Sequence, residues 1–515
     1  MRTILSALTS PLLGKISQSF HLNFLLAFTS LLWGLHLVYF SDQLSPSLTF
    51  KGGLDPMTNS LYVSDIAHHH IAISGLLFWG SSLSRSISAA TGLRASDLTR
   101  AAAPLSFIPS QALKSIHAIL GASLISLSIL SLISAYTIYS VPVYKFISFN
   151  SVTVTSIFSH HIWISLFLVM GACAHFTIYI IRDVSLPSNA LECSKHPLIR
   201  LINSKAAVIS HLSYVSLFLG FHTLGLYIHN DCVSAFGHPS SQILIEPILF
   251  RQSSSDPLSI GLLDLLNLIV NVLSPSSSFI RYTDPCDLLV AHAVSLGLHV
   301  TLLIILKGAF DSKGSRILPD KSSFGYAFPC DGPGRGGSCD ISSWDAFYLA
   351  FFWALNSTAW FLFNFHWHQL VSYSVSPATA LPSGGLSNIS SSISSASTLN
   401  GWFRDYLWFN SSSLIRGYDP SGSNDLGVWA WTFLLAHLCW AVSFMFLISW
   451  RGYWQELIDS IVYLHLKTPF LSAFWTPSFS SPVALSIVQA RFIGLSHFSV
   501  GYILTYAAFL IASSE

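Results

Sequence analysis

Hydrophobic residues fall in long stretches that are separated by polar segments. Each stretch has about the 20 residues that a helix needs to cross a bilayer. The segments between them are rich in Ser, Pro and Gly, which favours irregular connections. We expect an all-α polytopic membrane protein with about nine transmembrane helices. The expected spans are residues 21–42, 63–84, 112–140, 156–181, 206–229, 286–311, 341–366, 427–450 and 486–512.

Composition and charge agree with this pattern. Of the 515 residues, 52% are hydrophobic and 9% are charged, whereas soluble domains have about 25% charged residues. The mean hydropathy is +0.58. A net charge of +1 gives no indication of nucleic-acid binding. Most Lys and Arg residues collect in the loops of one membrane side, which the positive-inside rule makes cytoplasmic or stromal.

The loop at 324–341 lies on that side and contains the sequence FPCDGPGRGGSCD. Cys330 and Cys339 have eight residues between them. We interpret them as half of a four-cysteine iron–sulfur site, with a partner chain supplying the other half. A disulfide does not suit a reducing compartment, and a zinc site would have closer spacing. Two free thiols remain an alternative. Arg335 adds positive charge that would stabilise a reduced cluster.

The 21 histidines are numerous for a membrane protein, and many fall within or at the ends of the apolar stretches. Polar groups are costly there, so a use is expected. Consecutive helical residues point about 100° apart, so the run His68–His70 cannot bind one ion. The pairs His222/His229 and His292/His299 each share a helix face about 10.5 Å apart. This spacing suits separate flat macrocycles, chlorophyll or haem, better than one metal. Hydrogen bonds to neighbouring helices are the alternative.

The stretch 427–450 contains three groups that step towards the cysteine loop. His437 lies near the middle of the membrane, and Met445 lies about 12 Å further along the helix. If the helix continues, Trp454 follows about 13.5 Å beyond. The imidazole could ligate an electron donor, and the thioether could lie at an acceptor. The indole could stack on a quinone ring.

Three long segments resemble the photosystem I core reaction-centre family, and its B-type members in particular. They are FPCDGPGRGGSCDISSWDAFYLAFFWALN, VWAWTFLLAHLCWAVSFMFLISWRGYWQEL and PVALSIVQARFIGLSHFSVGYILTYAAFLIAS. The resemblance extends over nearly all of residues 20–515. It implies four antenna-type helices in residues 1–205. It also implies a reaction-centre domain in residues 206–515, with the iron–sulfur loop at 324–341 and a luminal loop at 367–426.

The resemblance implies a role for several residues near the electron path. Cys330 and Cys339 would hold half of an inter-subunit 4Fe–4S cluster. His437 would ligate one chlorophyll of the special pair. Asn356 would hold an accessory chlorophyll through water, and Met445 would ligate the primary acceptor chlorophyll.

Further implied sites lie on either side of the membrane and within it. Trp408 would belong to the docking surface for plastocyanin or a cytochrome c6-type donor. The phylloquinone pocket would comprise Ser449, Arg451, Trp454 and the backbone of Leu485. The antenna chlorophyll candidates are His36, His68, His69, His117, His160, His161, His211, His222, His229, His292, His299, His366 and His497.

The implied activity is light-driven electron transfer from the luminal donor towards ferredoxin in a thylakoid membrane, with a plastid expected. The implied cofactors are chlorophyll a with its magnesium, phylloquinone, the shared cluster, carotenoids and lipids. The expected partners are an A-type core subunit and a stromal ferredoxin-like iron–sulfur subunit. The chain begins just before the family's third spanning helix. Either the gene is split and another polypeptide supplies the two missing helices, or the antenna is reduced. Of these, we expect a split-gene C-terminal fragment.

Departures from the family include a Ser-rich insert at 386–398, and His368 and Gln369 where the family has Lys and His. Other classes of function remain open. One is a pigment-binding antenna chain without electron transfer, and another is a membrane haem oxidoreductase. A transporter would need charges converging at mid-depth, and the sequence has few.

Overall fold

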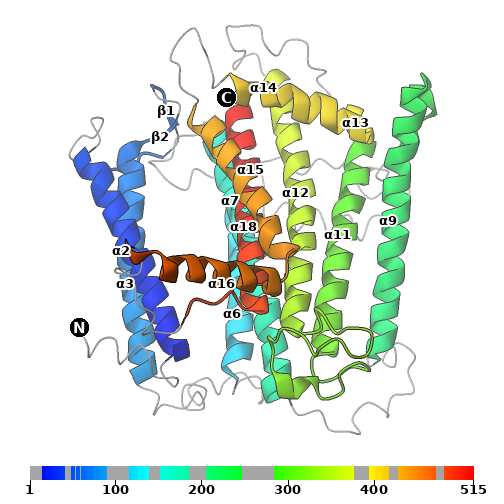
Figure 1. Cartoon of the computed structure of the whole chain (residues 1–515). Coiled ribbons are helices and arrows are strands. Elements are labelled where there is room, and N and C mark those ends of the chain that lie inside the picture. Colours follow the sequence, from blue (N-terminus) through cyan, green and yellow to red (C-terminus); the bar gives the residue numbers. More distant parts are fainter. Residues whose placement is uncertain are drawn as a thin grey trace, which may run out of the picture. The chain divides into compact units, whose positions relative to one another are not determined.

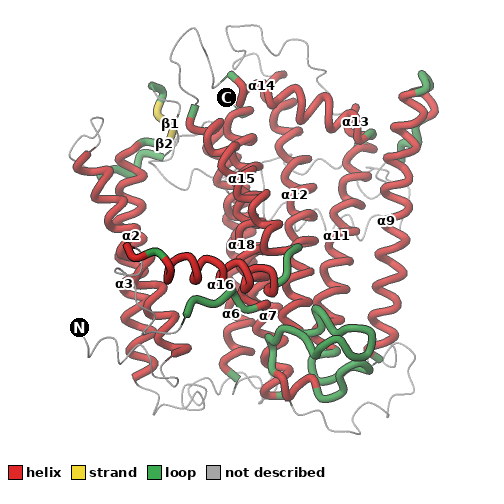
Figure 2. Tube along the Cα trace, viewed as in Figure 1, coloured by secondary structure: helices red, strands yellow, loops and turns green. Residues whose placement is uncertain are grey.

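The computed structural model describes most of the chain as helix (Figures 1 and 2). The described residues are 14–40, 48–52, 54–57, 60–89, 115–137, 151–184, 204–245, 284–375, 394–416, 427–470 and 481–514. Two compact units are present, one of residues 1–116 and 141–155, the other of residues 117–140 and 156–515.

The first unit contains α2 (Gly14–Phe40) and α3 (Val63–Ala89), which pack together. Gly34 permits this close contact, because a Cβ there would lie 2.7 Å from the Ile71 side chain. A small hairpin of β1 (Leu54–Asp55) and β2 (Ser60–Leu61) precedes α3.

The second unit is built from long apolar helices, because backbone groups in lipid must be satisfied within their own segment. In this unit α11 packs against both α9 and α12, and α15 packs along α18. Figure 2 shows the long irregular loop between α11 and α12. The helices are α6 (Ile116–Thr137) and α7 (Ser151–Asp183), whose first residues belong to the other unit, and α9 (Lys205–Ala235), α11 (Pro285–Phe310), α12 (Ser343–Val375), α15 (Val428–Leu447), α16 (Arg451–Lys467) and α18 (Ile487–Ser513).

Short helices lie in the loops of the second unit. The loop after α11 contains η4 (Lys321–Phe324). The loops at the opposite helix ends contain η2 (Pro239–Ser241), η5 (Ser394–Ser397), α13 (Leu399–Gly401), the π-helix η6 (Trp402–Trp408) and α14 (Phe409–Ile415).

Small residues allow the helices of the second unit to approach closely, as in membrane helix interfaces generally. At Gly501 of α18, a Cβ would lie 2.6 Å from Trp440 N and 2.7 Å from Ala436 O. The backbone of α15 therefore lies directly against this glycine. Because Ala436 precedes His437, the close contact helps to set the position of His437.

The predicted all-α, polytopic fold class is confirmed, with corrections to individual spans. Eight helices of the described ranges are long and apolar enough to cross a membrane. The expected span 63–84 forms α3 but is not among them, since three consecutive histidines and several serines lower its hydropathy. The span expected to end at 366 continues to Val375. The span 427–450 ends at Leu447, and a new helix starts at Arg451.

Candidate functional site

The cysteine loop forms a hairpin that places the two cysteines opposite each other. Cys330 and Cys339 are partners in an antiparallel backbone bridge, and both are free thiols. Ser338 links the two arms, because its Oγ accepts from Asp331 N and donates to Gly332 O, both at 2.8 Å. Among the described residues, no three His, Cys, Asp or Glu side chains converge as a metal site. The hairpin therefore offers two thiol ligands and no more.

The turn of the hairpin needs glycine. Gly336 and Gly337 have φ of 80° and 94°, in the left-handed region that other residues rarely adopt. Neither glycine would meet an atom within 4 Å if it carried a Cβ, so the requirement is conformational and the space beside the turn is open. Arg335 also has a positive φ, of 56°, and pairs with Asp331.

Arg491 of α18 holds both arms of the hairpin. Its Nη1 donates to Pro329 O at 3.1 Å, and its Nε lies 3.3 Å from Asp340 Oδ1. Nη1 also lies 3.0 Å from both carboxylate oxygens of Asp345, which is fully buried. Pro329 and Asp340 directly flank the two cysteines. The sequence interpretation missed this role, although an arginine within an apolar stretch is itself a signal of function.

The end of α15 gathers three of the predicted acceptor-side residues. Ser449 Oγ donates to Met445 O, and Trp454 Nε1 donates to Ser449 Oγ at 2.8 Å. The expected 13.5 Å step from Met445 to Trp454 assumed a continuous helix, and that assumption is wrong. The chain turns at 448–450, so the indole lies back beside the serine.

A second segment, distant in sequence, joins this group. Arg451 Nη2 donates to Ala484 O at 3.4 Å, and Gln455 Oε1 accepts from Ala484 N at 2.9 Å. Leu485, the residue predicted to contribute its backbone, comes next. The structure thus brings the four predicted pocket residues into one region at the start of α16.

Seven of the fourteen histidines predicted as ligands, and also His70, share one arrangement. Eight histidines of the described helices place Nδ1 within 2.7 to 2.9 Å of the carbonyl oxygen four residues earlier. A carbonyl only accepts, so Nδ1 carries the proton and Nε2 keeps its lone pair. This tautomer is ready to ligate a metal. The eight are His70, His161, His211, His222, His292, His299, His437 and His497, and His68 does the same with Thr49 O at 3.0 Å.

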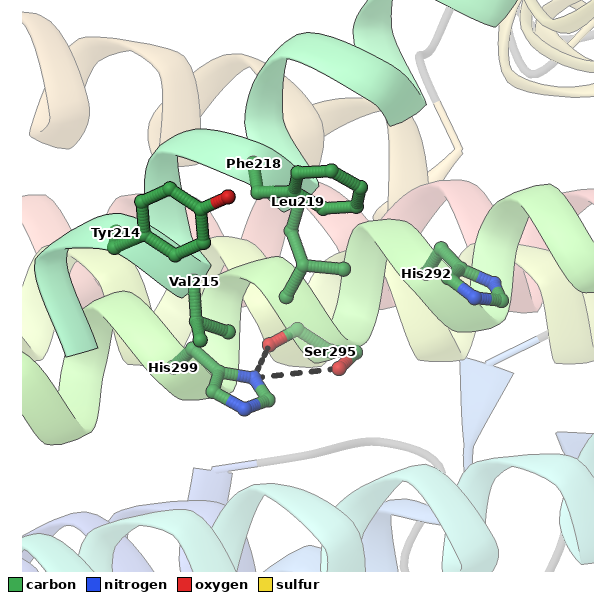
Figure 3. A pocket seen from close by; sticks show the side chains of 7 residues that line it. All are labelled: Tyr214, Val215, Phe218, Leu219, His292, Ser295 and His299. Carbon is green, nitrogen blue, oxygen red and sulfur yellow. Dashed lines mark hydrogen bonds between the residues drawn. The ribbon is translucent and has the colours of Figure 1, made fainter. Parts of the chain in front are cut away.

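Two of these histidines line a groove of about 360 Å³ between α9 and α11 (Figure 3). His292 and His299 lie towards its two ends, and Ser295 Oγ lies 3.3 Å from His299 Nδ1. The remaining wall consists of Tyr214, Val215, Phe218 and Leu219. An apolar, aromatic groove with imidazoles at both ends suits flat apolar ligands.

His366 does not fit its predicted ligand role in this structure. The side chain is fully buried, Nδ1 lies 2.8 Å from Tyr406 Oη and Nε2 lies 3.0 Å from Ser514 Oγ. Both ring nitrogens are therefore engaged within the protein, and we leave His366 out of the proposed ligands. His229 uses Nε2 towards Ser241 O at 3.0 Å, which leaves only Nδ1 as a candidate ligand atom.

The other predicted histidines have ring contacts. His117 and His175 stack with ring centroids 5.3 Å apart, and their Nδ1 atoms lie 3.0 Å apart. His36 stacks between two aromatic rings of α2. His69 and His160 each pack edge-on against the histidine that follows. For these residues the ligand role stays a prediction.

The two remaining predicted residues are exposed. Asn356 lies on α12 with its side chain accessible. Trp408 ends the π-helix η6 and is 71% exposed. The segment before it is anchored to α9, because the Asp231 carboxylate accepts from the backbone N–H groups of Leu399 and Asn400 at 3.0 and 2.9 Å.

A cluster of lysines lies beside the cysteine loop. Lys205 and Lys307 both pair with Asp311, at 2.9 and 3.6 Å. Lys321 of η4 is only 2% exposed. Burial, and then the charge of Lys307, lower the pKa of Lys321 to about 8. This end of the second unit therefore concentrates positive charge.

Sequence comparisons identify the family. The sequence model described as Photosystem I psaA/psaB protein matches residues 5–266 and 251–512. The chain is similar to proteins named Photosystem I P700 chlorophyll a apoprotein A2. It is 50% identical to that of Heterocapsa triquetra over 482 residues, which are 91% of this chain and 59% of the relative. It is 47% identical to that of Cyanidium caldarium over 495 residues, 91% of this chain and 65% of the relative. The chain thus spans about three fifths to two thirds of the length of these relatives. With matches over nearly its whole length, this chain belongs to the Photosystem I psaA/psaB family.

Proposed function

We propose that the chain is a B-type core subunit of photosystem I that binds chlorophyll a in a thylakoid membrane, with a plastid as its expected location. The names of its relatives support this proposal, since each is called a P700 chlorophyll a apoprotein A2. The partners would be an A-type core subunit and a stromal ferredoxin-like iron–sulfur subunit. When bound, the cofactors would supply light-driven electron transfer from a luminal donor towards ferredoxin.

The observation that carries the proposal is the pairing of Cys330 with Cys339. Two thiols at least partly accessible on one hairpin suit one half of a cluster with four cysteine ligands. The described residues offer no third ligand, which agrees with a site completed by a second chain. No protein atom lies within 4 Å of a Cβ built on Gly336 or Gly337, so this side of the turn is not closed by the chain itself.

The histidines support pigment binding. His437 is exposed on α15, and its Nδ1 is held by Phe433 O at 2.7 Å. Its Nε2 would ligate the magnesium of one special-pair chlorophyll. The remaining histidines of the same tautomer would ligate antenna chlorophylls. A hydrogen bond that fixes the tautomer also makes the ligand nitrogen more basic.

The quinone site is supported by the contacts at the start of α16. Trp454 would stack on the quinone ring, while the N–H of Leu485 would donate to a quinone oxygen. Ser449 holds the indole through its Nε1, and Met445 lies one helical turn before that serine. At the opposite helix ends, exposed Trp408 would contact plastocyanin or a cytochrome c6-type donor.

Electron paramagnetic resonance of the assembled complex tests the proposal. We expect a light-induced cluster signal that is lost in Cys330→Ser and Cys339→Ser and kept in Cys232→Ser. Cys232 is a matched control, since it is another free, exposed cysteine, in α9. Chlorophyll absorption without any cluster signal in the unaltered complex would leave an antenna role. Haem bands without chlorophyll would indicate a haem oxidoreductase instead.

A further inference from the structure

Gln455 connects two segments that lie far apart in the sequence. Its Oε1 accepts from Ala484 N at 2.9 Å and from Arg451 Nη2 at 3.4 Å. Its Nε2 donates to Asp459 Oδ1 at 2.9 Å. Because a carboxylate only accepts and a backbone N–H only donates, these partners fix the orientation of the amide. The side chain therefore has one arrangement that satisfies both of its ends.

The contacts of Gln455 and Arg451 hold the backbone next to Leu485. Arg451 donates to the Ala484 carbonyl at 3.4 Å, and that carbonyl shares a peptide plane with the Leu485 N–H. In a trans peptide the C=O and the following N–H point in opposite directions. Because Arg451 holds the Ala484 carbonyl towards α16, the Leu485 N–H points away from α16. Residues 481–486 form neither helix nor strand, so no regular ladder holds this backbone.

We infer that Gln455 is a positioning residue for the quinone pocket, which sets the direction of the Leu485 N–H through Arg451 and Ala484. The inference rests on the proposed function, because it names Leu485 as the hydrogen-bond donor to the quinone. A hydrogen bond to an anion is stronger than one to a neutral acceptor. The semiquinone would thus gain more from a well-directed N–H than the quinone, and Gln455 would raise the quinone's reduction potential indirectly. Figure 1 shows α16 running across the direction of α15 and α18.

Three variants of the assembled complex separate this role from a general effect on folding. Gln455→Leu keeps the side-chain size and removes all three hydrogen bonds. In the double variant Gln455→Glu with Asp459→Asn, the new carboxylate at 455 still accepts from Ala484 N and Arg451. The new amide at 459 then donates to the side chain at 455, which reverses the direction of that hydrogen bond. Glu456→Gln is the matched control, because Glu456 is the exposed neighbour on the same helix.

Two measurements on the branch formed by this chain decide the question. One is the coupling of the exchangeable proton on the light-induced semiquinone, by electron–nuclear double resonance in H2O and D2O. The other is the rate of electron transfer from the quinone to the cluster. In Gln455→Leu we expect a weaker coupling and a rate about threefold to tenfold faster, since a poorer hydrogen bond destabilises the semiquinone. The double variant should return both values to within about twofold of the unaltered complex, and Glu456→Gln should change neither.

Unchanged coupling and rate in Gln455→Leu, measured per assembled centre, would overturn the inference and leave the proposed function intact. A double variant that behaves like Gln455→Leu would also overturn it, since the hydrogen bonds would then be irrelevant. Absence of any semiquinone signal in the unaltered complex would instead contradict the proposed quinone site, and the inference with it.

Discussion

Arg491 offers the sharpest test of how the cysteine hairpin is held. Replacing it with leucine removes the contacts to Pro329, Asp340 and Asp345 together. Asp345 is fully buried, so its carboxylate would lose its cationic partner away from water. Removing one partner of a buried ion pair costs about 3–5 kcal/mol. The Ser342 hydroxyl still donates to Asp345 at 2.9 Å, which favours the lower part of that range.

The assay is a chaotrope titration of the purified complex that follows the signal of the proposed iron–sulfur cluster. We expect Arg491→Leu to release the cluster at a clearly lower concentration, equivalent to about 3 kcal/mol. Arg335→Ala is the control from the same loop. Arg335 is 51% exposed, and an exposed pair such as Arg335–Asp331 contributes about 0–1 kcal/mol.

A second comparison isolates the unpaired charge as the cause. Arg491→Leu combined with Asp345→Leu removes both charges, and buried pairs replaced by apolar residues often keep their stability. We therefore expect the double variant to resist the chaotrope better than Arg491→Leu alone. Two results would refute the reasoning. One is equal resistance of Arg491→Leu and Arg335→Ala, and the other is a double variant no better than the single one.

Three further predictions concern other parts of the second unit. Gly501→Ala should destabilise the complex by about 1–3 kcal/mol, because its Cβ would meet the α15 backbone. It should also shift the difference spectrum of the pigment that we propose His437 ligates, and an unchanged spectrum would contradict this. The pKa of Lys321 is about 8 in the folded chain against 10.5 ordinarily, so the unfolded chain binds more protons between these values and stability should rise with pH there. Thermal unfolding at pH 8 to 10 should show this rise, and Lys321→Met should abolish it; parallel curves would refute it. Asp231→Ala should slow re-reduction by the proposed luminal donor about threefold, since losing the acceptor of the Leu399 and Asn400 N–H groups loosens the segment before Trp408. Flash kinetics at several donor concentrations would check it, and an unchanged second-order rate would rule it out.

The sequence was sufficient to locate most of the long helices. Apolar length located α9, α11 and α18 to within a few residues, apart from the longer C-terminal end of α9. It placed the end of α15 at 450 and not at Leu447, because Ile448 and Trp450 extend the apolar stretch beyond the helix. The break there decides where Trp454 lies.

Contacts between distant segments were not predictable in the same way. Arg491 lies 152 positions beyond Cys339, and nothing near either residue in the sequence connects them. His366 looked like the other histidines of the apolar stretches. Its two ring nitrogens are engaged by Tyr406 and Ser514, which belong to other elements. Contacts with other elements thus make His366 differ from the other histidines of the apolar stretches.

The tautomer of the helical histidines has a consequence for assembly. In His211, His222 and His437, the acceptor of Nδ1 belongs to the same helix, one turn earlier. The hydrogen bond that fixes each imidazole tautomer therefore lies within one helix and does not depend on a neighbouring helix. If these histidines ligate chlorophyll as we propose, such a helix could receive its pigment as soon as it enters the bilayer, before other helices pack against it. Pigment loading would then follow the order of synthesis, and the pigments would become part of the surface on which later helices pack.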